Sequence, residues 1–153
     1  MSVSIVDRGY ARLYKSVLKT KSLKTFTVGV HQSEGNTAHS GGSITVGEIA
    51  AVHEFGSSDG KVPQRSWLSA WVDQQASEIA IKLQGAAKGV LSGKLDPGVA
   101  VEVLAQDFVG KIRERIADGI MPPLAESTIA RKGSSTPLID TGLFRSSITY
   151  RVD

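Results

Sequence analysis

Apolar residues follow the period of a helix near the beginning of the chain. Five of them stand three or four positions apart, and basic residues occupy the opposite side. The five are Tyr10, Leu13, Tyr14, Val17 and Leu18. This spacing predicts an amphipathic helix. Over residues 25–30 apolar and polar residues then alternate, which predicts a half-buried strand.

Two long helical patterns occupy the middle of the chain. The first covers about residues 65–91 and carries Trp67 and Trp71 near its start. The second begins after the Asp-Pro pair at residues 96–97, which is typical of a helix N-terminus, and its apolar stripe stops near Gly119. Two neighbouring helices with a short connection predict an antiparallel helical hairpin.

A shorter helix is predicted between the strand pattern at residues 25–30 and the first long helical pattern. Thr45 and Glu48 have the spacing of a capping box, and Gly56 can end the helix in a left-handed conformation. The preceding residues 33–43 are rich in Gly, Ser and other polar residues, with almost no apolar side chain. Such a segment buries too little surface to offset its ordering entropy, so a mobile loop is expected there.

The last part of the sequence returns to a strand pattern. A short helix is expected at residues 126–132, and residues 148–152 alternate again. We expect this second strand to pair with residues 25–30. The whole pattern predicts one α+β domain over residues 1–153. In it, a small, mainly antiparallel sheet packs against a long helical hairpin plus an N-terminal amphipathic helix.

Composition agrees with a single core that is held together by packing. The chain has 153 residues, of which 41% are hydrophobic, and it contains no cysteine. Disulfides and thiolate metal sites are therefore excluded. Asp7 and Arg8 interrupt the first residues, so no secretory signal is expected, and no apolar run approaches the roughly 20 residues that span a bilayer. We expect a soluble protein made in the cytoplasm.

Positive charge is concentrated at one end of the chain. The net charge is +3, yet residues 1–30 hold six basic residues and one acidic residue, a local charge of +5. Two interpretations of this basic segment stay open. It is either a solvated helix face or a surface that meets phosphate or an acidic partner.

Side chains suited to catalysis or metal binding are few. His53 and Glu54 resemble half of a zinc-peptidase helix, but Ser57 occupies the position of the second histidine. His31 and His39 fall beside or within the predicted loop and are expected to be solvated. The sequence has no glycine-rich phosphate loop and no motif for a serine or cysteine nucleophile. We therefore expect no catalytic residue, no bound metal and no cofactor.

Two parts of the sequence, one before and one after the long helices, carry distinctive motifs. Residues 46–56 read VGEIAAVHEFG and are followed at residues 62–68 by VPQRSWL. Residues 127–133 read STIARKG, and residues 137–150 read PLIDTGLFRSSITY. In this order, with a helical hairpin between them, these segments resemble the tail-completion, neck and virion-morphogenesis (head-tail joining) family of tailed bacteriophages. Ser66 departs from the pattern, because many relatives place a proline there.

The resemblance implies a structural protein of the virion and no enzymatic activity. Such proteins assemble as rings, commonly with six copies, at the head-tail junction or the tail end, where they serve tail completion and head-tail joining. The implied partners are a tail terminator or tail-tube protein and a head-closure or connector protein. Separately from the resemblance, the basic residues leave non-specific contact with passing DNA open. The implied interface or structural positions are Glu54, Phe55, Gly56, Pro63, Arg65, Asp140, Thr141, Gly142 and Arg145.

The same positions can be interpreted without the family. Asp140 and Gly142 suit a tight turn that starts the last strand, and an interface role is the alternative. Arg65 is expected to pair with Glu54 or Asp140 and so to lock two loops together.

Other interpretations also stay open. Phe55 and Trp67 are either core side chains or contacts to a neighbouring subunit. Beside the ring subunit, two other function classes remain. One is a hydrolase that uses His53 and Glu54, and the other is a basic nucleic-acid-binding module built on residues 10–18.

Overall fold

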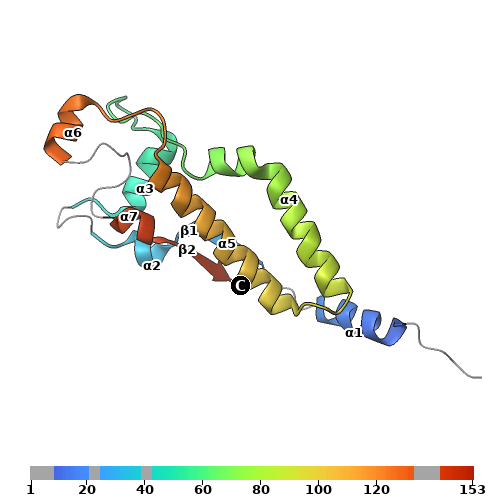
Figure 1. Cartoon of the computed structure of the whole chain (residues 1–153). Coiled ribbons are helices and arrows are strands. Elements are labelled where there is room, and N and C mark those ends of the chain that lie inside the picture. The colour runs from blue at the N-terminus through green and yellow to red at the C-terminus, as the bar shows by residue number, and fades with distance from the viewer. Residues whose placement is uncertain (1–8, 21–24, 39–42, 133–141) are drawn as a thin grey trace, which may run out of the picture.

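The structure is a computed structural model that describes residues 9–20, 25–38, 43–132 and 142–153. These residues form seven helices and one two-stranded antiparallel sheet (Figure 1), so the expected mixture of helices and strands is confirmed for them. In chain order the elements are α1 (Tyr10–Thr20), β1 (Phe26–Val30), α2 (Gln32–Gly35), α3 (Val46–Phe55), α4 (Ser69–Leu91), α5 (Pro97–Asp118), α6 (Glu126–Lys132), α7 (Leu143–Ser146) and β2 (Ile148–Val152).

The sheet joins two segments that lie far apart in the sequence. Strands β1 and β2 run antiparallel, with Val30 opposite Ile148. Helix α5 lies along this sheet and contacts both strands (Figure 1). The ring of Phe26 in β1 packs on the ring of Phe108 in α5, with 5.9 Å between the ring centres. The predicted pairing of the two alternating segments is therefore confirmed.

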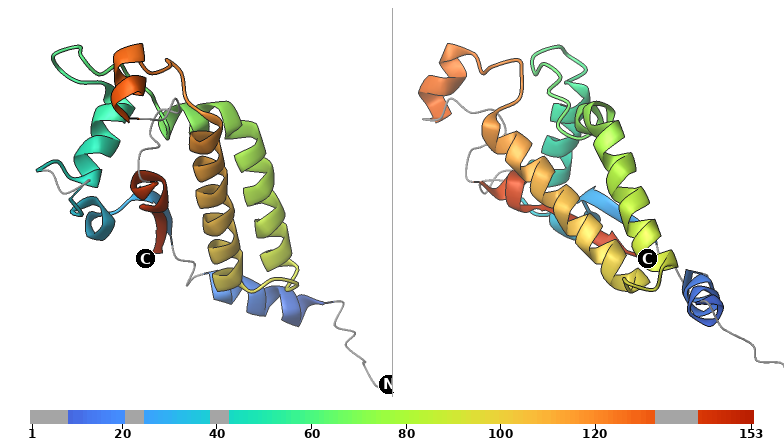
Figure 2. Two further views of the ribbon diagram at one scale, coloured as in Figure 1. Left: turned by 60° about the vertical axis from the view of Figure 1, so that its left-hand side comes forward. Right: turned by 45° about the vertical axis from the view of Figure 1, so that its right-hand side comes forward.

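Helices α4 and α5 are the longest elements and contact each other. Residues 92–96 connect them and reverse the chain direction (Figure 2). Asp96 caps α5 as predicted, since its carboxylate accepts the first N–H groups of that helix. The ring of Trp71 in α4 packs on Phe108 in α5, with 5.7 Å between the ring centres. Phe108 thus links both long helices to the sheet.

Helix α4 begins at Ser69, later than the predicted start near residue 65. The N–H groups of Trp67, Leu68 and Ser69 donate to the carboxylate of Glu54 in α3. The first N–H groups of a helix have no partner within the helix. Because Glu54 supplies that partner, it fixes the start of α4 at this point of the chain.

The core lies between α3, α5, α7 and the sheet. Its largest fully buried side chains are Val46, Ile112, Ile116 and Ile148. Both tryptophans are buried beside them, so Trp67 is a core residue, one of its two predicted roles. The capping box of α3 is present as predicted, with Thr45 and Glu48 each bonding the backbone of the other.

The first part of residues 33–43, which the sequence predicts to be a loop, has regular structure. Residues 33–35 belong to α2, and Ala38 forms a β-bridge with Thr45. Residues 39–42 lie outside the described residues.

A close backbone contact explains why α2 is ordered without apolar anchors. Gly35 is buried against Gly47 of α3. A Cβ atom on Gly47 would lie 3.2 Å from the carbonyl oxygen of Gly35. Two glycines permit this approach, which no hydrophobic pattern in the sequence reveals.

Helix α1 lies across the end of α4 and α5, away from α3 and α6 (Figure 2). It is helical as predicted, and its contacts are with α4. Its apolar side chains do not join the core, since all five of them are between 42% and 74% exposed.

Candidate functional site

The carboxylate of Glu54 connects the end of α3 to the start of α4. It accepts the N–H groups of Trp67, Leu68 and Ser69, each at 3.0 Å. It also accepts the hydroxyl of Ser66 at 2.8 Å. The side chain is buried, with only 6% of the residue exposed. Glu54 is therefore the N-terminal cap of α4, supplied from a neighbouring helix.

The charge of Glu54 suits this position. Burial raises the pKa of its carboxyl, but hydrogen bonds from Leu68, Ser69 and Ser66 outweigh that effect, so the pKa lies below its usual value. The ionised form also faces the positive end of the α4 dipole. Glu54 is thus a charged group whose lone pairs are already used inside the fold.

Ser66 extends the same network. Its hydroxyl donates to Glu54 and accepts the N–H of Ala70 in the first turn of α4, at 3.0 Å. A proline at position 66 has no hydroxyl for these two bonds. The departure from the family pattern at this position therefore has a local structural role in this chain.

Arg65 is buried in the same region but does not pair with Glu54. Its guanidinium donates to the carbonyl oxygen of Pro122 at 2.7 Å and to that of Pro123 at 3.0 Å. Its backbone N–H donates to the carbonyl oxygen of His53 at 2.7 Å. The expected pairing with Glu54 is therefore wrong, because the Glu54 carboxylate is occupied by the start of α4. The alternative partner, Asp140, lies outside the described residues.

The surroundings of Arg65 are those of a structural anchor. Only 3% of the residue is exposed, and burial lowers the pKa of its guanidinium. The bonds of its guanidinium reach the segment that follows α5, more than fifty positions along the chain. Arg65 thus fixes the segment after α5 against the α3–α4 connection. It joins two segments as expected, but its partners are backbone carbonyl oxygens and not a carboxylate.

Gly56 and Pro63 shape the connection between α3 and α4. Gly56 follows α3 with a φ of 82°, and a Cβ atom there would lie 3.3 Å from the backbone nitrogen of Gln64. Helix α3 ends at Gly56 as predicted, but with a ψ of 165° the residue is not in the left-handed helical conformation that was expected. Pro63 is exposed on this connection. The side-chain amide of Gln64 donates to the carbonyl oxygen of Glu54 at 2.9 Å, which closes the turn.

Phe55 differs from its neighbours because it points away from the core. It is 75% exposed, so its interpretation as a core residue is wrong. An exposed phenylalanine beside a fully bonded glutamate is a candidate contact for another molecule.

The second signature segment packs against the first. Gly142, with a φ of 77°, starts α7, which places a helical turn between the expected turn and strand β2. Phe144 of α7 is buried and meets Trp67 edge to face, with 5.3 Å between the ring centres. Asp140 and Thr141 lie outside the described residues.

Arg113 is a structural residue that the sequence did not reveal. From α5 it donates to the carbonyl oxygens of Ser146 and Ile148, at 2.7–3.1 Å, and so fixes the α7–β2 junction. The one signal in the sequence is a basic residue beside the apolar stripe of α5. Arg145 lies nearby, exposed at a shallow hollow that Arg113 and Glu114 also line. Arg145 is therefore a charged surface residue beside the α7–β2 junction.

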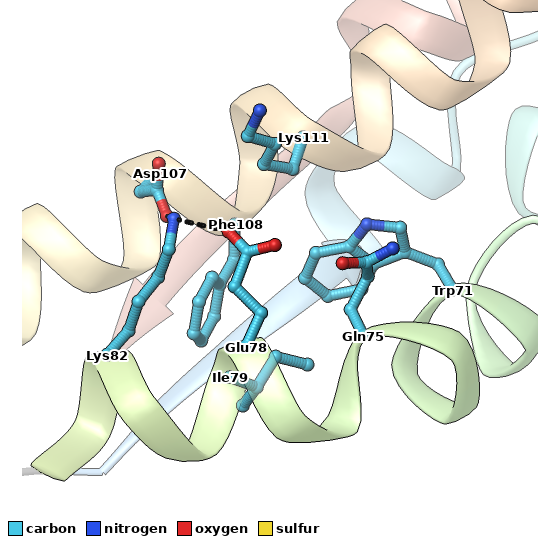
Figure 3. Close-up of a pocket in the computed structure, with 8 residues that line it drawn as sticks. All are labelled: Trp71, Gln75, Glu78, Ile79, Lys82, Asp107, Phe108 and Lys111. Atoms are coloured by element: carbon cyan, nitrogen blue, oxygen red, sulfur yellow. Dashed lines mark hydrogen bonds and ion pairs between the residues drawn. The ribbon is translucent and has the colours of Figure 1, made fainter.

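A small cavity between α4 and α5 is too small for a substrate (Figure 3). Its volume is about 20 Å³, near that of one water molecule. At its rim Lys82 pairs with Asp107 and with Glu78. The pKa of Lys82 is raised, mainly by its hydrogen bond to Asp107. These groups link two helices, and their charges are satisfied by one another.

The described residues contain no group of three or more His, Asp or Glu side chains placed to hold a metal ion. No helix among them is long and apolar enough to cross a membrane.

Comparison with known proteins adds no relative: no protein-family model, no curated protein and no solved structure matches the chain.

Proposed function

We propose that the chain is a structural, non-enzymatic subunit of a ring in a tailed bacteriophage, at the head-tail junction or the tail end. In that position it serves tail completion and head-tail joining. The proposal begins from the resemblance of two sequence segments to the tail-completion and neck family. The structure contributes an independent observation about these segments.

The observation that carries the proposal is the packing of the two segments on each other. Trp67 comes from the first segment and Phe144 from the second, and their rings are in contact. Glu54 and Arg65 fix the surrounding backbone through buried hydrogen bonds. The described parts of the two distant segments thus pack against each other, which supports reading them as one structural signature.

This unit leaves two side chains free for neighbours. Phe55 offers an apolar contact, and Arg145 offers a charged one. Buried aromatic and arginine side chains are enriched where protein interfaces gain most of their binding energy. We propose that they contact another copy of the chain in a ring of six, or the tail terminator, tail-tube, head-closure or connector protein.

A deletion experiment tests the function. Removing the gene from the phage that encodes the chain is expected to leave filled heads and tails that do not join, seen by electron microscopy of the lysate. Supplying the wild-type chain in trans is expected to restore infectious particles. Normal particles after the deletion would refute the proposal.

A pair of variants tests the role of Phe55 in the same complementation. Phe55→Asp is expected to lower the yield of infectious particles by roughly tenfold or more, as for the loss of an interface anchor. Val103→Asp is the matched control, because Val103 is also exposed but lies on α5 outside both signature segments. The free energy of unfolding of both variants is expected to lie within about 0.5 kcal/mol of the wild-type value. Equal yields would remove Phe55 from the interface.

A second role, non-specific contact with nucleic acid, is favoured by one observation. Arg12 and Lys15 of α1 are exposed and share a hollow with Lys94. A cluster of basic residues attracts phosphate. Affinity for duplex DNA is then expected to fall steeply as the salt concentration rises. The double variant Arg12→Glu/Lys15→Glu is expected to abolish this binding. Binding that is independent of salt would exclude it.

A further inference from the structure

The apolar side of α1 forms a ridge whose residues stay 42–74% exposed in the described part of the chain. The ridge consists of Tyr10, Leu13, Tyr14, Val17 and Leu18. The rings of Tyr10 and Tyr14 stack with 6.2 Å between their centres, which gives the ridge a flat end. A helix of eleven residues is marginal in water unless its apolar face is packed. The ridge therefore has the properties of a binding surface.

The basic side and the apolar side of α1 have different surroundings. Arg12 and Lys15 line a hollow together with residues 93–97 of the α4–α5 connection. Their positions in the helix lie opposite Tyr10, Tyr14 and the rest of the ridge. The basic side of α1 thus borders the α4–α5 connection of its own chain, where Arg12 and Lys15 stay exposed, and the apolar side lies on the opposite face of the helix.

The same chain carries an apolar groove of matching character. It lies between the second half of α4 and the first half of α5, with a volume of about 560 Å³. Leu83 and Leu91 are half exposed at its surface, and Val90 and Val101 are buried at its base. Phe26 of β1 also lines it. The volume suits several aliphatic and aromatic side chains.

We propose that α1 of one copy lies in the α4–α5 groove of a second copy, so that copies join head to tail. Each copy offers one ridge and one groove, which are different surfaces. Repetition of such a contact closes a ring when the rotation between copies permits it. The choice of a second copy as the occupant rests on the proposed ring function and on the area available.

The area of the ridge supports a contact between folded copies. From the exposed fractions of its five side chains, the ridge presents roughly 600 Å² of surface. A standard protein interface buries about 800 Å² on each partner. The ridge alone thus approaches that size, and each subunit of a ring uses two such contacts. A lipid surface would cover the ridge but would leave the groove open.

Disulfide trapping tests the proposal, because the chain has no cysteine of its own. A chain with Leu13→Cys is mixed with a chain with Leu91→Cys under oxidising conditions. A disulfide-linked heterodimer is expected, and it should disappear on reduction. Ile81→Cys in place of Leu91→Cys is the matched control, since Ile81 is 69% exposed on α4 and lies about 150° around the helix from the middle of the face that lines the groove. Equal trapping by Ile81→Cys would overturn the proposal.

The double variant Leu13→Cys/Leu91→Cys shows whether α1 lies in the groove of its own chain or in that of a second copy. Covalent oligomers are expected if α1 enters a second copy. A disulfide only within single chains, at every protein concentration, would show that α1 occupies its own groove and would overturn the proposal.

Association of the purified chain gives a second, independent measure. Sedimentation of Leu13→Glu and of Leu83→Asp is expected to show at least tenfold weaker self-association than the wild type, while Ile81→Asp should match the wild type. Unchanged association in both would overturn the proposal, and so would flotation of the wild type with anionic vesicles in the absence of self-association.

The outcomes separate this interface from the proposed function. If trapping fails but the gene deletion still blocks head-tail joining, the interface is wrong and the function stands. If trapping succeeds but the deletion leaves normal particles, the interface stands and the function is wrong.

Discussion

The carboxylate of Glu54 accepts the N–H of Ser69, the first residue of α4, at 3.0 Å. The residue at the N-cap position of α4 is Leu68, whose side chain makes no capping bond. The longest helix of the chain therefore takes its cap from the last turn of another helix. Folding of α3 and the start of α4 are coupled through one side chain, and the first two predictions follow from this coupling.

Replacing Glu54 is expected to destabilise the fold. Glu54→Gln keeps the shape but removes the charge, and should cost about 1–2 kcal/mol of unfolding free energy. Glu54→Ala leaves buried N–H groups without a partner and should cost about 2–4 kcal/mol. Urea unfolding measures both. Glu114→Gln is the control, because Glu114 is exposed on α5, and it should change little.

Acid is expected to remove the contribution of Glu54. Its pKa in the folded chain lies below the ordinary value of 4.5, so ionised Glu54 stabilises the fold above that value. The contribution is lost as the pH falls below 4.5 and through the lower folded pKa. The wild type should therefore lose more stability than Glu54→Gln between pH 6 and pH 3. Parallel pH profiles of the two proteins would contradict this assignment.

Substitution of Arg65 is expected to affect folding before assembly. Arg65→Lys cannot reproduce the two bonds from one planar group to Pro122 and Pro123, and should cost on the order of 2–4 kcal/mol. Arg65→Glu, which the sequence alone would assign to a subunit interface, should fail to fold because it buries a carboxylate against carbonyl oxygens. Circular dichroism and thermal unfolding measure these effects. Normal folding of Arg65→Glu would contradict the anchoring role.

Two glycine substitutions of opposite sign test the turn after α3. Gly56→Ala forces an alanine to a φ of 82° and brings its Cβ close to Gln64, so it should destabilise by about 1–2 kcal/mol. Gly85→Ala in the middle of α4 meets open space and should stabilise by about 0.5–1 kcal/mol. Differential scanning calorimetry of both variants distinguishes them. A Gly56→Ala variant that is as stable as the wild type would show that the Gly56 conformation is not required.

Local signals in the sequence predicted most of the elements. The capping box of Thr45 and Glu48, the Asp96 cap and the alternation of β1 and β2 are all properties of a few consecutive residues. Their pairing into one sheet also followed, because the chain offered two alternating segments and no third. These features need no knowledge of distant contacts.

The other contacts between distant residues were not predictable. Arg65 bonds to carbonyl oxygens that every residue possesses, so nothing in the sequence marks Pro122 or Pro123 as its partners. The approach of Gly35 to Gly47 depends on the absence of side chains, which a search for apolar residues overlooks. The exposed ridge of α1 has the same pattern as a buried helix, and only the fold shows that its residues stay exposed in the described part of the chain.

The order of synthesis gives the pairing of β1 with β2 a consequence in time. His31, at the end of β1, bonds the hydroxyl of Thr149 in β2, 118 positions later. At translation rates of about 5–20 residues per second, β1 emerges on the order of ten seconds before its partner exists. Until then its hydrogen-bonding edge and the side chains of Phe26 and Val28 have no sheet to join. A nascent chain stalled before Ile148 therefore presents an unpaired strand, the state in which binding by a chaperone competes with aggregation.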